Sequence, residues 1–283
     1  MSDASDWLGL RGKNVLVTGL RNKKSVAWHV GSRLADAGCN VIWSVHTEPR
    51  AAEAREMMPG ATVFVCDVED RARIDALAAE LERREVTLDG LVHSIAHASY
   101  TAKPDGTARR FHEVPKADFL RAIDVSCYSL IALSDALKER FREKASVVAI
   151  SISTTRMASE SYGYMAPVKA ALDSTVVFLA QSFARRGDVR FNSVNPGLLK
   201  TSSSGGIPGY LESYLFAEQA TLRKRALKTE EVADAVLFLL SERSSGVNAQ
   251  SLVVDAGMSV NYFDRDLVRR ALRPDEPSGG GPT

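Results

Sequence analysis

Tyr162 and Lys169 are the pair of residues whose types and spacing first suggest catalysis. They lie seven positions apart, so a helix that begins near this point places them two turns apart on one face. A neighbouring ammonium lowers the pKa of a phenol, about 10 when unperturbed, toward working pH. The phenol can then donate a proton or hydrogen bond to an oxygen that becomes negative as a hydride arrives. A Tyr-x6-Lys pair also arises by chance, so its place in the fold decides between the two interpretations.

Two serines stand shortly before this pair. Ser151 and Ser153 flank Ile152 at the end of a predicted strand over residues 147–151. Residues two apart on a strand share a face, which allows both hydroxyls to face a substrate. We therefore count Ser151 and Ser153 with Tyr162 and Lys169 as candidate catalytic residues.

A glycine turn after the first predicted strand suggests a dinucleotide site. Residues 14–18 run into Gly19, and a helix predicted over residues 25–37 follows. Ser25 is placed to cap that helix and donate to a phosphate, with Val26 beside it. The turn lacks the G-x-G-x-x-G pattern, so a solvated basic loop containing Arg21, Lys23 and Lys24 explains it equally well.

Other predicted strand ends strengthen the cofactor interpretation. Asp67 and Val68 can meet an adenine, and Ser94, Ile95 and Ala96 are small enough at the next strand end for a ribose to lie against the backbone. After residue 45 the chain reads His46-Thr47-Glu48-Pro49-Arg50. Glu48 would hold ribose hydroxyls and repel a 2′-phosphate, whereas Arg50 would attract one. These residues favour NADH and leave NADPH open.

The elements that must position these residues alternate strand and helix along the chain. Short apolar runs between longer helices are typical of parallel strands buried on both faces. We predict a single doubly wound Rossmann-fold α/β domain over residues 1–265, with a seven-stranded parallel sheet flanked by helices, and a partly disordered tail over 266–283. Residues 202–214 are predicted to form a mobile functional loop. The predicted strands are 14–18, 41–45, 62–66, 88–95, 147–151, 189–194 and 251–255, and the predicted helices are 25–37, 50–58, 74–84, 117–140, 166–185 and 230–241.

Composition excludes several function classes. The 283 residues carry 36 Lys and Arg against 35 Asp and Glu, a net charge of +1, which gives no electrostatic reason to expect nucleic acid or an anionic membrane as partner. No segment is apolar enough to span a bilayer, and the amino terminus does not resemble a secretory signal. The three cysteines lack C-x-x-C spacing, so we expect no metal site, no disulfide framework and a cytoplasmic location.

Together these motifs resemble the short-chain dehydrogenase/reductase family. The resemblance rests on Thr18-Gly19, Asp67-Val68, Tyr162 with Lys169, and Asn195-Pro196-Gly197. Within that family, the Gly19-x5-Ser25-x-Ala27 turn, the strand end over residues 92–96 and the segment 124–129 are most similar to NADH-dependent enoyl-acyl carrier protein reductases. The resemblance covers about residues 8–262.

The resemblance implies a homotetrameric reductase that delivers hydride from NAD(P)H to C3 of a 2-enoyl thioester. The acyl group is then of fatty-acid or polyketide origin, free or carrier-bound. On that analogy Tyr162 hydrogen-bonds the enolate oxygen and Lys169 holds the nicotinamide ribose. The remaining implied contacts are Gly197, Leu199 and Thr201 to the cofactor, residues 202–214 as a substrate-covering loop, and Phe216 and Leu222 as walls of an acyl pocket.

Three positions depart from the enoyl reductase pattern. Ile152 stands where a second aromatic residue is usual, Asn195-Pro196-Gly197 reads as the ordinary turn of the wider family, and His97 replaces a group that is usually apolar or aromatic. We therefore count His97 and Ile152 among the candidate substrate contacts. Because of these departures, the alternative function is that of a carbonyl reductase or alcohol dehydrogenase that uses Ser151 or Ser153 with Tyr162. A cofactor-binding protein without catalysis is the third interpretation.

Overall fold

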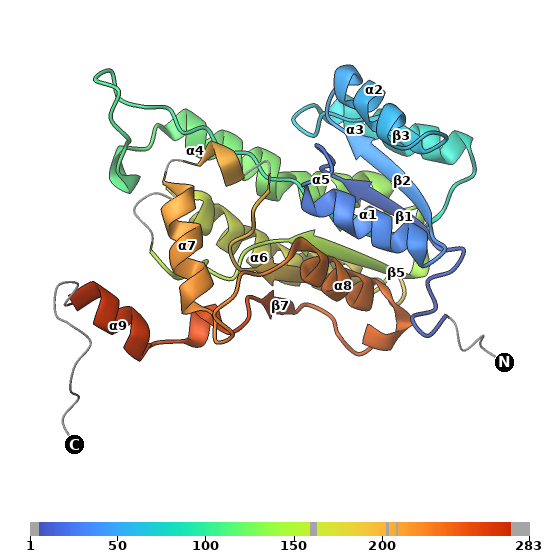
Figure 1. Ribbon diagram of the computed structural model, residues 1–283. Helices are drawn as coiled ribbons and strands as arrows, with labels where there is room; N and C mark the ends of the chain where they lie inside the picture. Colours follow the sequence, from blue (N-terminus) through green and yellow to red (C-terminus); the bar gives the residue numbers. More distant parts are fainter. Residues whose placement is uncertain (1–5, 159–162, 202–203, 208, 273–283) are drawn as a thin grey trace.

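A seven-stranded parallel sheet forms the centre of the molecule, in the order β3-β2-β1-β4-β5-β6-β7. This confirms the predicted doubly wound Rossmann fold. The computed structural model describes the chain except residues 1–5, 159–162, 202–203, 208 and 273–283 (Figure 1). The strands are β1 (Asn14–Thr18), β2 (Asn40–Val45), β3 (Thr62–Val65), β4 (Leu88–His93), β5 (Phe141–Ile150), β6 (Arg190–Pro196) and β7 (Ser251–Val254).

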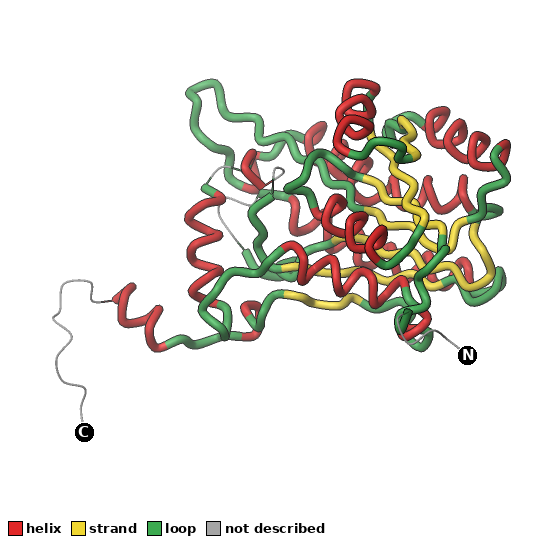
Figure 2. Tube along the Cα trace, turned by 45° about the vertical axis from the view of Figure 1, so that its right-hand side comes forward, coloured by secondary structure: helices red, strands yellow, loops and turns green. Residues whose placement is uncertain are grey.

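Helices cover both faces of this sheet, as Figure 2 shows. Alternate residues of β1 face opposite layers: Val15 and Val17 pack with α1, α2 and α8, whereas Leu16 packs with α3, α5 and α6. The helices are α1 (Val26–Asp36), α2 (Glu48–Met57), α3 (Arg71–Arg83), α4 (Lys116–Ile123), α5 (Ser129–Leu137), α6 (Met165–Phe183), α7 (Tyr210–Ala220), α8 (Thr229–Leu240) and α9 (Arg265–Leu272).

The single helix predicted over residues 117–140 is helical from Lys116 to Leu137, but it is not one regular α-helix. A π-helical turn, η2 (Asp124–Tyr128), separates α4 from α5, and α5 ends at Leu137. Strand β5 begins at Phe141, six residues before the predicted start. The first residues of β5 are largely exposed and polar, so they carry no apolar run that would indicate a strand.

The carboxyl-terminal third contains more helix than predicted. Helix α7 begins at Tyr210, so the end of the predicted loop 202–214 is helical. Helix α9 had no predicted counterpart, and it stands apart from the sheet in Figures 1 and 2. Among the described residues, no helix is long and apolar enough to cross a membrane.

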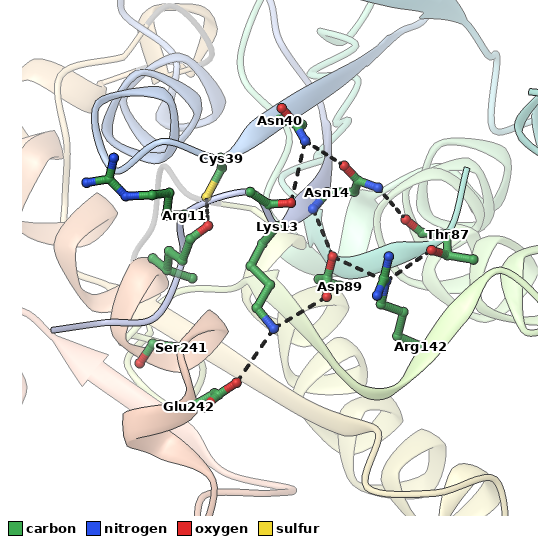
Figure 3. A network of polar contacts seen from close by, with 12 residues as sticks. Arg11, Lys13, Asn14, Cys39, Asn40, Thr87, Asp89, Arg142, Ser241 and Glu242 are labelled. Carbon is green, nitrogen blue, oxygen red and sulfur yellow. Dashed lines mark hydrogen bonds and ion pairs between the residues drawn. The ribbon is translucent and has the colours of Figure 1, made fainter. Parts of the chain in front are cut away.

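A polar network joins the amino ends of the central strands (Figure 3). The carboxylate of Asp89 on β4 accepts a hydrogen bond from the backbone N–H of Asn14 at 2.9 Å. It also pairs with Lys13 at 3.5 Å and with Arg142 of β5 at 3.6 Å. The network fixes the register of β1, β4 and β5 at the end opposite to the predicted site.

Candidate active site

The glycine turn after β1 closely approaches the end of β4. Gly19 has φ +83°, and a Cβ placed on it would lie 1.9 Å from the carbonyl oxygen of Ser94. Only glycine therefore fits here. β1 and β4 are adjacent although β2 follows β1 in sequence, so the turn lies where the strand order reverses. Open α/β sheets bind ligands in the crevice at this point.

Helix α1 begins directly after the turn, with Ser25 as its N-cap as predicted. The Ser25 hydroxyl donates to the carbonyl of Asn22 at 2.7 Å and accepts from the backbone N–H of Trp28 at 3.4 Å. Val26 is the first residue of the helix. The positive end of the helix dipole therefore faces the crevice, which suits a phosphate.

The residues predicted to hold the adenosine half of a dinucleotide follow the ends of β2 and β3. Asp67 and Val68 follow β3, and the Asp67 carboxylate accepts from the N–H of Glu69 at 3.1 Å. His46 is exposed after β2. The guanidinium of Arg50, which would attract a 2′-phosphate, donates to Glu53 at 2.6 Å. This pairing suits NADH.

Lys169 lies at the carboxyl edge of the sheet. Its ammonium donates to the carbonyl of Ile150 at the end of β5, at 2.8 Å, and to that of Ile95 after β4, at 3.2 Å. Burial lowers the pKa of Lys169 to about 8, against the opposing influence of Asp173 and Cys127. The ammonium of Lys169 is therefore held between the ends of two strands, and its pKa lies close to neutral pH.

Tyr162 lies outside the described residues, so its position remains a prediction. Gly163, with φ +58°, and Tyr164, the N-cap residue, precede the first residue of α6, Met165. Helix α6, which carries Lys169, therefore begins three residues after position 162.

The two candidate serines lie beyond the strand that was expected to align them, because β5 ends at Ile150. The Ser151 hydroxyl is buried and donates to the carbonyl of Lys169 at 3.4 Å. The backbone N–H of Ser153 donates to the carbonyl of Pro196 at 2.8 Å. Its hydroxyl is buried with no hydrogen-bond partner among the described residues. Ile152, between them, is half-buried.

A half-buried carboxylate, Asp173, lies one turn after Lys169 and was not predicted from the sequence. Asp173 accepts from the side-chain amide of Asn195 at 3.0 Å and from the hydroxyl of Ser193 at 3.3 Å. Burial raises the pKa of Asp173, and hydrogen bonds, among them one from Ser151, oppose that rise. Its spacing of four from Lys169 on α6 was the available signal.

The turn after β6 is bound by a side chain of α7, Tyr210. The N–H of Gly197 donates to the carbonyl of Val254 at 3.0 Å. The N–H of Leu199 donates to the hydroxyl of Tyr210 at 3.0 Å, and that hydroxyl donates to the carbonyl of Leu199 at 2.8 Å. The N–H of Thr201 donates to the hydroxyl of Ser204 at 2.9 Å. Tyr210 was not among the predicted site residues.

The opposite wall comes from the segment after β4. His97 accepts at its carbonyl from the Ser126 hydroxyl at 3.3 Å and donates from its N–H to the same hydroxyl at 2.9 Å. Burial lowers the pKa of His97, and Arg121 acts in the same direction. Phe216 is 60% exposed on α7. In Figure 1, α7 and the segment after β4 lie on the side where the strand arrows end.

Comparison with known proteins gives one consistent family. The family model described as enoyl-(acyl carrier protein) reductase matches residues 19–259. The NADH-dependent enoyl-acyl carrier protein reductase FabI of Enterococcus faecalis is 31% identical over 88% of this chain and 98% of its own length. The FabI of Nostoc is 30% identical over 89% and 98%.

Solved structures agree in fold. The enoyl-acyl carrier protein reductase (NADH) of Aquifex aeolicus superposes with a TM-score of 0.83, at 27% identity over 90% of this chain and 99% of its own. The enzyme of Bacillus cereus, in a complex with NADP⁺ and an indole naphthyridinone, gives a TM-score of 0.81 at 26% identity, over 89% and 98%.

Proposed function

The chain belongs to the enoyl-(acyl carrier protein) reductase family, and from this premise we propose that it reduces the carbon–carbon double bond of an enoyl thioester with NADH. The observation that carries the proposal is the position of Lys169. Its ammonium bridges the ends of β4 and β5, at the sheet edge where the Gly19 turn meets Ser94. A dinucleotide in that crevice has both a phosphate site and a cation beside it.

The residues at this edge fit NADH. The backbone approach at Gly19 leaves no room for a Cβ, and the start of α1 with Ser25 and Val26 suits the pyrophosphate. We assign the adenosine half to His46, Asp67 and Val68, and the nicotinamide half to Ser94, Ile95, Ala96, Gly197, Leu199 and Thr201. When bound, NADH supplies the hydride.

The chain's own residues then hold the substrate and stabilise charge. We assign to Lys169 the ribose hydroxyls and, through its positive charge, a lowered pKa for the phenol of Tyr162. Tyr162 donates a hydrogen bond to the thioester oxygen, which becomes negative as hydride reaches the carbon β to the carbonyl. A proton added at the α carbon completes the saturated product. His97, Ile152 and Phe216 are the proposed substrate contacts.

A carbonyl reductase using Ser151 is the competing activity. Its hydroxyl contacts both the carbonyl of Lys169, at 3.4 Å, and the carboxylate of Asp173, which disfavours a role at a substrate carbonyl. Ser153 remains a candidate because its hydroxyl has no partner among the described residues. Both activities consume NADH, so the substrate distinguishes them.

We propose a homotetramer that acts on an acyl chain carried by an acyl carrier protein or as a small thioester. A first group of exposed apolar side chains lies on η2, α5 and α6: Tyr128, Ile131, Val177 and Phe178. Helix α6 touches η2 where Cys127 contacts Thr175 at 3.3 Å. The outermost strand exposes Leu252 and Val253 as a second. Two separate apolar faces can support the two kinds of twofold contact in a tetramer. Phe178→Glu should yield a smaller assembly in sedimentation, and an unchanged assembly contradicts this use of the first face.

The cytoplasm is the compartment we propose. All three cysteines are free and buried, which suits a reducing environment.

The test of the activity follows NADH oxidation with crotonyl thioester and with a panel of ketones. We expect turnover of the thioester, and turnover of ketones alone contradicts the proposal. Tyr162→Phe should lower kcat about 10²-fold or more and leave NADH binding, measured by fluorescence, unchanged. Tyr262→Phe, at a fully exposed position, is the matched control. Full activity of Tyr162→Phe removes this phenol from the mechanism.

A further inference from the structure

The ammonium of Lys169 is buried, and the two groups that it binds are uncharged. Only 4% of Lys169 is exposed, and its ammonium donates to the backbone carbonyls of Ile150 and Ile95, at 2.8 and 3.2 Å. Carbonyl oxygens orient a cation without balancing its charge. A buried ammonium that lacks a counter-charge tends to lose its proton. The cation therefore depends on a negative group close by.

Asp173 is placed to be that group. It lies four residues after Lys169 on α6, the spacing at which side chains of a helix are neighbours. Both side chains also meet the chain at the end of β5. The ammonium binds the carbonyl of Ile150, and the carboxylate of Asp173 accepts a hydrogen bond from the hydroxyl of the next residue, Ser151. The positive and the negative group are therefore held at the same strand end.

Two further donors bind the carboxylate of Asp173 from β6. The side-chain amide of Asn195 donates to it at 3.0 Å, and the hydroxyl of Ser193 donates at 3.3 Å. Hydrogen bonds of this kind favour the ionised form of a carboxyl group, and here they oppose the effect of burial. Asn195 begins the turn that departs from the enoyl reductase pattern, so this donor is one that the resemblance did not imply.

The other titratable groups near Lys169 are neutral at neutral pH. Burial raises the pKa of Cys127 on η2, so its thiol keeps its proton. Burial and the charge of Lys169 lower the pKa of His93 on β4 to about 3, so its imidazole is uncharged. β6 contributes the amide and hydroxyl just described. In the part of the chain that the structure describes, Asp173 is thus the ionised group that acts on Lys169.

We propose that Asp173 is a positioning residue of the reductase, whose carboxylate serves as the counter-ion that keeps Lys169 charged at the cofactor edge. This inference rests on the proposed function, because that function assigns the nicotinamide ribose to Lys169. Asp173 is bound by donors of the protein itself, so it acts through Lys169. An ammonium makes stronger hydrogen bonds to the ribose hydroxyls than a neutral amine does.

The test measures the Kd for NADH by fluorescence, without substrate, as the pH is raised. For the wild type, we expect the Kd to rise through about pH 8, where Lys169 loses its charge. In Asp173→Asn this midpoint should fall by about one pH unit, because an ammonium without its counter-ion releases its proton more easily. At about pH 6, where Lys169 is charged in both proteins, the two Kd values should agree within about twofold.

Two control variants separate charge from packing. Asp173→Glu keeps the negative charge and should keep the midpoint of the wild type, even if the longer side chain weakens binding at every pH. Asp188→Asn removes the same charge at an exposed position before the amino end of β6, at the end of the sheet opposite to Lys169. It should leave both the midpoint and the Kd unchanged.

The outcomes distinguish this proposal from the proposed function. An Asp173→Asn protein that binds NADH more weakly at every pH, with an unmoved midpoint, overturns the counter-ion role and leaves a structural one. If this variant does not fold, Asp173→Ser, a smaller neutral replacement that can still accept from Asn195, decides in its place. The expected midpoints without turnover of any enoyl thioester refute the reductase activity but support the role of Asp173. Absence of NADH binding by the wild type refutes both proposals.

Discussion

The hydroxyl of Tyr210 binds both backbone polar groups of Leu199, accepting from its N–H at 3.0 Å and donating to its carbonyl at 2.8 Å. Leu199 is the residue whose backbone we assign to the carboxamide of the cofactor. A carboxamide also presents one donor and one acceptor side, so it competes with Tyr210 for the same two atoms. We therefore expect cofactor binding and the position of α7 to be coupled.

The first prediction follows from this competition. Tyr210→Phe should lower the Kd for NADH about two- to tenfold, because one pair of competing hydrogen bonds is removed. Titration by fluorescence measures the change. Tyr214→Phe, on the same helix, should leave the Kd unchanged. Weaker NADH binding by the Tyr210 variant would mean that this hydroxyl supports the cofactor site.

A second prediction concerns the turn after β1. Gly19→Ala should abolish detectable NADH binding and lower the free energy of unfolding, because its Cβ would meet the carbonyl of Ser94 at 1.9 Å. Gly60→Ala is a matched control: Gly60 has the same φ, +83°, and no atom within 4 Å of the added Cβ. The control isolates backbone strain, worth about 1 kcal/mol, from the steric clash. Equal effects of the two substitutions on NADH affinity would contradict the role of the turn.

The third prediction is an alkaline limit on activity. Lys169 has its pKa lowered to about 8 by burial, so it is charged below that pH and loses its charge above it. We expect kcat/KM to fall as the pH rises through about 8, since the cation no longer supports the phenol or the ribose. Lys169→Arg keeps its charge and should move this limit to higher pH, at reduced activity. A limit unmoved in this variant assigns the titration to another group.

A fourth prediction concerns stability in acid. His93 is fully buried, with Nε2 2.8 Å from the hydroxyl of Ser129, and burial together with the charge of Lys169 lowers its pKa to about 3. The unfolded chain protonates this histidine near its ordinary value of 6.5. The stability associated with neutral His93 is therefore complete above that value and is lost as the pH falls from there toward 3.

Between pH 7 and 4.5 this loss amounts to about 2–3 kcal/mol. His93→Gln, which cannot titrate, should lose that much less than the wild type in denaturant unfolding at the two pH values. His112→Gln, at an exposed position, should behave as the wild type does. Identical pH dependence in all three proteins would show that His93 does not titrate on unfolding.

The strands and the turn after the first of them could be predicted because their signals are local. The apolar run of Asn14–Thr18 and the glycine after it specify both a strand and its turn, and Ser25 specifies the helix start. The Lys169 position followed from the resemblance together with the fifth strand. These features depend on neighbours in the sequence.

The contacts between distant segments could not be predicted. Asp173 meets Asn195 only because α6 packs against β6, and Tyr210 reaches Leu199 only because α7 folds back. The shared face expected for Ser151 and Ser153 failed because the strand ends at Ile150, a boundary that the apolar pattern does not mark. Contacts between polar side chains that are far apart in the sequence produce no periodic pattern from which they could be predicted.

The π-helical turn η2 limits which sequence changes the fold can accept. Each residue of an ordinary helix advances about 100° around the axis, so the wider turn rotates everything after it relative to α4. Ser126 within η2 clamps both backbone groups of His97, while Ser129 just beyond it meets His93 in the core. Deleting one residue of η2 would restore a regular helix. One of the two serines would then lose its hydrogen bond to its histidine. Insertions and deletions in η2, whose residues Val125, Ser126 and Cys127 are buried, should therefore be tolerated less well than substitutions at its exposed position.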